Sequence, residues 1–208
     1  MKIAVITEGS TKFNNADVVR VLEELGHEVV NLGMKDIEGE PDLTYLETSF
    51  LSALVLQLEA VEFVVGGCGT GQGYMNAVLQ YPGVACGLLT DPVEAWLFSQ
   101  VNAGNCVSLQ LNKGYGKVNG DINLRFMFEK LFNDTYGQGY PAVRGAIQKG
   151  ARKKLEAIST ATHYSMKEIL NRMDRSVIEN ALAYPGVVEF LKQAPSSELK
   201  EEILKFTK

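Results

Sequence analysis

The sequence predicts an α/β fold: a Rossmann-like, three-layer, doubly wound, five-stranded parallel sheet with a helical C-terminal extension. Five short apolar runs of strand length alternate with segments whose apolar residues recur at helical spacing. After residue 135 the alternation stops, and only helical patterns follow. We therefore expect a sheet domain over residues 1–135 and a helical extension over residues 136–208.

The strands are predicted from short apolar runs that end in polar or glycine-rich segments. In chain order they are Lys2–Thr7, Glu28–Leu32, Glu62–Val65, Val84–Leu89 and Cys106–Leu111. Because each is separated from the next by a helical pattern, the strands should run parallel with right-handed crossovers.

The helices of the sheet domain are predicted from their apolar faces and end signals. They are Ala16–Leu25, ended by Gly26, then Asp42–Glu59, a short helix after Gly73, a helix from Thr90 to Val101, and Asn123–Phe132. The fourth has a clear start, since Asp91 suits the N-cap and Pro92 the first helical position.

The C-terminal part, from Arg144 to Lys208, has helical signals only, after a loop at 136–141. We expect breaks at Gly150, at Pro185-Gly186 and at Pro195. Two segments, Ser165–Met173 and Ser196–Phe206, are amphipathic. We expect this extension to pack on the sheet domain or on another subunit.

The composition excludes several classes of partner. The 208 residues are 46% hydrophobic and 22% charged, with a net charge of −5 and no block of Lys or Arg, so neither nucleic acid nor an anionic membrane is expected as a partner. Cys86 and Cys106 lie in apolar strand patterns and read as small core residues. The chain shows no signal-peptide pattern and no apolar run of about 18 residues. We therefore expect a cytoplasmic protein.

A glycine-rich segment at residues 66–73 is the strongest functional signal. It places Cys68 among five glycines, between the third strand and a short helix. In a parallel sheet, ligands bind at the carboxyl ends of strands. Glycines allow a close approach of the backbone to a small molecule, and the amides opening a helix favour negative charge and a thiolate.

Three chemistries compete for this segment. The dinucleotide fingerprint fails because Gln72 or Tyr74 stands where its third glycine should be, and a P-loop would need Lys after Gly73. A cysteine nucleophile needs a histidine base, and only His27 and His163 exist. No His, Cys or Asp cluster has a metal-ligand spacing. Proton transfer next to a carbonyl needs only a thiolate base and donors for a developing oxyanion.

Several motifs, in order, resemble the family of ribose-5-phosphate isomerase type B and galactose-6-phosphate isomerase. The resemblance covers residues 1–132. It rests on Cys68-Gly69-Thr70-Gly71-Gln72-Gly73, Thr90-Asp91-Pro92, Asn102-Ala103-Gly104-Asn105, Leu25-Gly26-His27-Glu28-Val29 and Pro41-Asp42.

The resemblance implies an aldose–ketose isomerase that works through a cis-enediolate, without metal or cofactor, on a small carbohydrate. It implies that Cys68 is the base, that Thr70 and Asn102 assist, and that a homodimer or a dimer of dimers forms. The amides that would hold the substrate and the enediolate are those of Gly69, Gly71 and Gly73.

Three departures from the family pattern bear on the substrate. Glu8 replaces an Asp, while Gly9 and Val101 stand where the family has histidines. The phosphate-binding arginines are not evident, and Arg144 is the nearest candidate cation. We expect a different sugar phosphate, an unphosphorylated sugar or a sugar acid. The alternative is a non-catalytic sugar-binding or partner subunit of a heteromeric isomerase.

Overall fold

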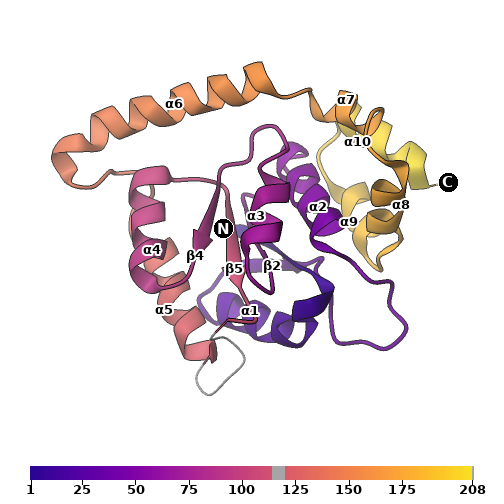
Figure 1. Ribbon diagram of the computed structural model, residues 1–208, viewed down its shortest axis with the longest axis horizontal. Helices are drawn as coiled ribbons and strands as arrows, with labels where there is room; N and C mark the ends of the chain where they lie inside the picture. The colour runs from indigo at the N-terminus through magenta and orange to yellow at the C-terminus, as the bar shows by residue number, and fades with distance from the viewer. Residues whose placement is uncertain (114–119, 208) are drawn as a thin grey trace.

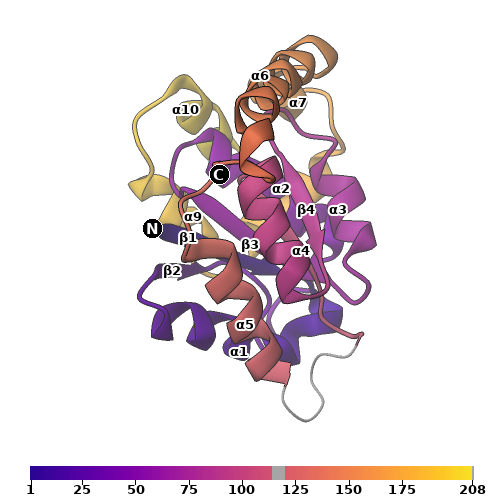
Figure 2. The ribbon, with the colours of Figure 1, turned by 90° about the vertical axis from the view of Figure 1, so that its left-hand side faces the viewer.

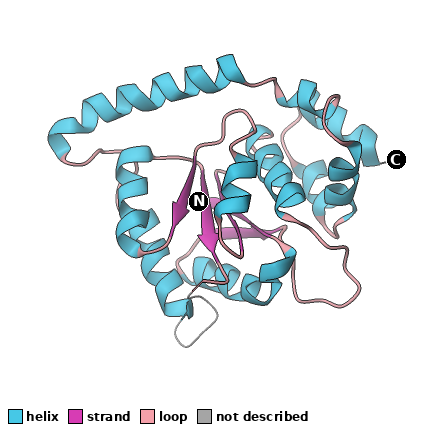
Figure 3. Cartoon of the chain, viewed as in Figure 1, coloured by secondary structure: helices cyan, strands magenta, loops and turns pink. Residues whose placement is uncertain are grey.

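The computed structural model describes residues 1–113 and 120–207. Its five parallel strands form one sheet in the order β2-β1-β3-β5-β4, so the predicted fold class is confirmed (Figure 1). The strands are β1 (Lys2–Thr7), β2 (Glu28–Asn31), β3 (Phe63–Cys68), β4 (Cys86–Leu89) and β5 (Cys106–Gln110). Figure 3 shows the strands in the middle of the molecule, with helices around them.

Ten α-helices are assigned in the described residues. Those of the sheet domain are α1 (Lys12–Glu24), α2 (Tyr45–Gln57), α3 (Gln72–Val78), α4 (Pro92–Leu97) and α5 (Gly120–Phe132). Those of the extension are α6 (Gly145–Thr162), α7 (Met166–Leu170), α8 (Arg175–Ala183), α9 (Val187–Gln193) and α10 (Glu198–Leu204).

The strands alternate their side chains between two apolar layers. One core joins Ile3, Phe63 and Val107 to α1, α4 and α5, and Figure 2 shows α4 and α5 side by side in front of the strands. The other core joins Ala4 and Val64 to α2, α3 and helices of the extension. Burial of both strand faces explains why the strands read as continuous apolar runs.

The strand order creates a switch point between β1 and β3. The chain leaves β1 toward β2 on one side and then returns to place β3 on the other side of β1. In doubly wound sheets the ligand crevice lies outside the carboxyl ends of the strands at such a point. This places the residues that follow β1 and β3 at the expected position of a site.

Some predicted boundaries are wrong, for local reasons. Helix α2 begins at Tyr45 and not at Asp42, because Thr44 caps it and forms a capping box with Glu47. Strand β3 runs on through Cys68, because Gly66 and Gly67 still pair with β1 and β5.

The predicted break at Gly150 is also wrong. Gly150 lies inside α6, at a position where an added Cβ would meet nothing within 4 Å. An exposed glycine inside a helix costs only about 1 kcal/mol relative to alanine. The helix therefore continues through it.

The extension has two parts. Helix α6 lies along the molecule and none of its residues is buried, whereas α7–α10 pack with α2, burying Met166, Ile178 and Leu191 among others. The breaks predicted at 185–186 and at Pro195 fall between helices. Lys208 lies outside the described residues, and the domain boundary at residue 135 stays a prediction. Over residues 1–113 and 120–207, every helix is too short or too polar to traverse a bilayer.

Candidate active site

Cys68 is the last residue of β3, where it pairs with Gln110 of β5. The chain then turns sharply into α3: the amide of Gly71 donates to the Cys68 carbonyl (3.2 Å), and Gly71 has φ +73°. A side chain there would be strained and would also meet Leu88. Gly71 therefore allows the tight turn that places the Cys68 thiol between the end of β3 and the start of α3.

Glu8 follows β1 and contacts the loop after Cys68 across the switch point. Its side chain is 9% exposed. The carboxylate accepts hydrogen bonds from the amides of Gly69 (3.3 Å) and Ser10 (3.2 Å), and from the Ser10 hydroxyl. One buried carboxylate thus connects the loop after β1 to the loop after β3.

The Cys68 sulfur lies close to Gly73 and to two side chains. It lies 4.0 Å from the Thr70 hydroxyl and 3.7 Å from the point where a Cβ of Gly73 would stand. The ring of Tyr45 lies 3.6 Å from the same point. Cys68, Thr70 and Tyr45 therefore surround the surface left bare by Gly73.

The three glycine amides predicted to hold a ligand differ in availability. Gly69 donates to Glu8 and Gly71 donates to the Cys68 carbonyl. Gly73, in the first turn of α3, has no acceptor for its amide within the described part of the chain. Its amide is thus free to meet a ligand.

Three further residues at this edge were missed by the sequence analysis. The Asn112 side chain donates to the Ser10 carbonyl (3.3 Å), and the Asn112 amide donates to the Gly69 carbonyl (3.0 Å). Asn112 follows the fifth strand, so its position at a carboxyl end was a usable signal. No comparable signal marks Ser10 or Tyr45.

Asn102 and Arg144 are not brought to Cys68 within one chain. Asn102 precedes β5, whose last residue lies opposite Cys68, and five residues of strand span about 13 Å. Arg144 is exposed just before α6. Figure 1 shows α6 beyond the ends of β4 and β5 opposite their arrowheads.

Asn102 instead borders a cavity of about 490 Å³ beneath α6. Arg152 of α6 also borders it and donates to the carbonyls of Val101 (2.8 Å) and Gly137 (2.9 Å). The sequence analysis did not single out Arg152. One chain therefore carries two separate groups of candidate residues, at opposite ends of the sheet.

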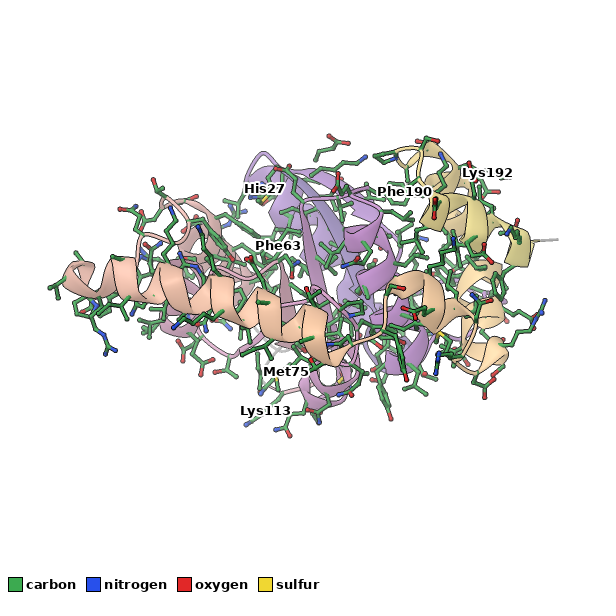
Figure 4. All side chains as sticks on the ribbon, turned by 90° about the horizontal axis from the view of Figure 1, so that it is seen from above. His27, Phe63, Met75, Lys113, Phe190 and Lys192 are labelled. Atoms are coloured by element: carbon green, nitrogen blue, oxygen red, sulfur yellow. The ribbon has the colours of Figure 1, made fainter. Side chains whose placement is uncertain are left out.

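Neither histidine lies beside Cys68. His27 stacks edge-on against Phe132, with ring centroids 4.8 Å apart, and burial lowers the pKa of its imidazole. Figure 4 places His27 and Met75 of α3 on opposite sides of the molecule. His163 ends α6 and its Nδ1 lies 3.0 Å from the Ser159 carbonyl. A Cys–His nucleophile therefore has no support from the geometry.

Over residues 1–113 and 120–207, no group of three or more His, Cys, Asp or Glu side chains could hold a metal ion.

A family profile described as Ribose/Galactose Isomerase matches residues 3–138. A comparison of the sequence with curated proteins found no match.

Two solved structures resemble the whole chain, each with a TM-score of 0.93. A 4-deoxy-L-threo-5-hexosulose-uronate ketol-isomerase, complexed with a tartrate, is 37% identical over 99% of this chain and 98% of its own. A ribose-5-phosphate isomerase from Vibrio parahaemolyticus is 36% identical over 99% of both chains.

A type B ribose 5-phosphate isomerase from Trypanosoma cruzi is more distant. It is 20% identical with a TM-score of 0.65, over 77% of this chain and 97% of its own, and supports the fold alone. The family profile covers well over half of this chain, and the two structures at 36–37% identity cover nearly all of it. The chain therefore belongs to the ribose/galactose isomerase family and is a sugar isomerase.

Proposed function

We propose that the protein is a cofactor-independent aldose–ketose isomerase with Cys68 as the base, acting through a cis-enediolate. The carrying observation is the position of the thiol. It ends β3 at the switch point of the sheet, 4.0 Å from the Thr70 hydroxyl and beside the bare surface of Gly73. A base beside hydrogen-bond donors is what proton transfer next to a carbonyl requires.

In the proposed reaction, the Cys68 thiolate takes the proton from C2 of the open-chain aldose. The electron pair of that C–H bond forms the C1–C2 double bond of the enediolate, and the former carbonyl oxygen becomes an oxyanion. The Thr70 hydroxyl and the Gly73 amide donate to the enediolate oxygens. The C2 hydroxyl passes its proton to the C1 oxyanion, and the electron pair left on O2 forms the C2 carbonyl. The C1–C2 double bond takes the proton back from the Cys68 thiol at C1, which gives the ketose and regenerates the thiolate.

We propose that a homodimer or a dimer of dimers completes the site. Asn102 and Arg144 lie away from Cys68 in their own chain, so their proposed roles require those residues from a second copy. Asn102 of that copy would donate to the oxyanion. The Arg144 guanidinium of that copy would meet an anionic end of the substrate.

The proposed substrate is a sugar phosphate or a related sugar or sugar acid in its open-chain form. The absence of a histidine beside Cys68 among the described residues favours a substrate that needs no ring opening. The two similar structures are described as acting on a ribose phosphate and on a hexosulose uronate. We also propose a cytoplasmic location, since the three free thiols suit a reducing compartment.

Deuterium exchange tests the proposal. The pure protein is incubated in heavy water with pentoses, hexoses, their phosphates and uronates, among them D-ribose 5-phosphate and 4-deoxy-L-threo-5-hexosulose uronate. We expect solvent deuterium at C1 or C2 of at least one sugar. Cys68→Ala should lower the exchange rate by at least about 100-fold, the usual share of a general base.

The control is Cys106→Ala, which removes a buried thiol of β5 outside the site. It should exchange at the wild-type rate once circular dichroism shows a folded protein. If a sugar binds but takes up no solvent deuterium, the proposed isomerase reaction is refuted and a non-catalytic subunit is favoured. Full activity of Cys68→Ala would remove Cys68 as the base.

A further inference from the structure

Tyr45 is an exposed aromatic residue at the edge of the Cys68 crevice. It is the first residue of α2 and is 42% exposed, whereas residues 47–55 of the same helix are buried. Two of its ring carbons lie 3.6 Å from the Cβ position of Gly73, and the Cys68 sulfur lies 3.7 Å from that position. The aromatic ring and the thiol thus approach the same point beside Gly73.

The backbone of Tyr45 is held firmly. The Thr44 hydroxyl accepts the amide of Leu46 (3.1 Å), and the Glu47 carboxylate accepts the amide of Thr44 (2.9 Å). This capping box fixes the start of α2. The point at which the Tyr45 side chain leaves the backbone is therefore fixed at the start of α2.

Contacts within the chain do not account for the ring. Over residues 1–113 and 120–207, Tyr45 has no hydrogen-bond partner for its hydroxyl and no ring or cation neighbour. Other exposed tyrosines have such partners: Tyr140 packs on Trp96 at 5.0 Å, and Arg172 lies 4.0 Å from the ring centre of Tyr164. An unpartnered, partly exposed ring beside the proposed base is available for contact with a ligand.

We propose that Tyr45 is a specificity-determining residue whose ring stacks on the C–H face of the carbohydrate held at Cys68. This rests on the proposed function. The face of an aromatic ring is negative and attracts the weakly positive hydrogens of sugar carbons. A tyrosine also loses little conformational entropy on binding. Because Gly73 has no side chain, none stands between the ring and the sulfur.

Stacking of this kind acts alike on the bound substrate and on the enediolate. Such uniform binding lowers KM and leaves kcat nearly unchanged. Tyr45→Ala should therefore raise KM about 3- to 10-fold, the range of an aromatic contact. Tyr45→Phe should keep the wild-type KM, because the ring and not the hydroxyl makes the contact.

The experiment measures kcat and KM for D-ribose 5-phosphate and for 4-deoxy-L-threo-5-hexosulose uronate, using whichever the wild-type protein converts. The variants are Tyr45→Ala, Tyr45→Phe and Tyr45→Leu. The leucine variant keeps an apolar side chain but has no aromatic face. Tyr45→Leu should be impaired like Tyr45→Ala, and it serves if the alanine variant does not fold. Phe126→Ala is the control, because Phe126 is also an exposed ring and lies on α5, away from Cys68.

The outcomes separate the two proposals. If the wild-type protein converts no sugar, the proposed function fails and the stacking role fails with it. If the wild type is active but Tyr45→Ala and Tyr45→Leu keep its KM, only the role of Tyr45 is overturned. The role is also overturned if Tyr45→Phe is as impaired as Tyr45→Ala, or if Tyr45→Ala changes the molecular mass in solution.

Discussion

Glu8 is the residue that joins the two sides of the crevice. Three donors converge on its nearly buried carboxylate: the Gly69 amide, the Ser10 amide and the Ser10 hydroxyl. Hydrogen bonds to a charged acceptor are stronger than neutral ones. Glu8 therefore has a structural role in holding the Cys68 loop, whether or not it also contacts the substrate.

The variant Glu8→Gln tests the role of this carboxylate. In Glu8→Gln an amide with one acceptor oxygen and two N–H donors must face three donors. We expect the free energy of unfolding to fall by about 1–3 kcal/mol, the cost of leaving a buried polar group unsatisfied. We also expect a lower kcat/KM, since the Cys68 loop loses a contact. Urea denaturation and steady-state kinetics measure the two effects.

Glu62→Gln is the matched control for Glu8. Glu62 also accepts a backbone amide, that of Lys2 at 2.6 Å, but its side chain is exposed. Its variant should lose less than about 1 kcal/mol, since water replaces the lost contact. Equal losses in the two variants would refute a special role for the buried carboxylate.

At the scale of elements, the C-terminal extension holds the connection between β2 and α2. Tyr184, after α8, is 1% exposed, and its hydroxyl accepts the Lys35 amide (3.0 Å) and donates to the Glu40 carboxylate. Burial and the neighbouring Glu40 raise the pKa of this hydroxyl. Further along the same connection, the Leu43 carbonyl accepts the amide of Gly9 (2.8 Å), next to Glu8.

Tyr184→Phe tests this connection. The variant keeps the buried ring but removes the acceptor of the Lys35 amide, so that amide should exchange with solvent about 5- to 10-fold faster. Hydrogen exchange followed by NMR measures it. Tyr74→Phe is the control, because it removes a buried hydroxyl that donates to Ser52 (2.6 Å) and should leave Lys35 unchanged. Unchanged exchange of Lys35 in Tyr184→Phe would mean that the extension does not hold this segment.

At the scale of the whole molecule, α6 has the surface of an interaction helix. Its Ile147, Leu155 and Ile158 are 66%, 57% and 56% exposed, and Figure 4 shows the helix lying across the molecule from above. Exposed apolar groups gathered on one element are typical of protein interfaces. This surface supports the proposed assembly, in which a second copy brings Asn102 to Cys68.

Mixing two inactive variants tests that assembly. Cys68→Ala and Asn102→Ala should each be inactive alone. In a mixed two-fold dimer, one site carries both substitutions and the other carries neither, so random exchange should restore roughly a quarter of the wild-type activity. Activity is measured after mixing and re-equilibration. No recovery, despite mass-spectrometric proof of mixed dimers, would show that the two residues do not share a site.

The sequence by itself determined the class of the fold and, within the candidate site, the loop that carries Cys68. The spacing of apolar residues that marks a strand or a helix is set by residues close together in the chain, so the five strands and most helices were predictable. The Cys68 loop was also predictable, because its thiol, glycines and following helix are contiguous in the chain. Asn112 could also have been predicted, because it follows the fifth strand and ligands bind at the carboxyl ends of parallel strands.

Only the tertiary structure decided which distant residues meet. The contact of Glu8 with Gly69 spans 61 positions, and the strand order that creates it follows from long-range packing rather than local pattern. The same holds for the ring of Tyr45 over Gly73. The structure also separated Asn102 and Arg144 from Cys68, because they lie at the end of the sheet opposite the thiol. For Asn102 this end could have been predicted, because it precedes the fifth strand whereas Cys68 ends the third. The place of Arg144 depends on how the extension packs against the sheet, which no local pattern encodes.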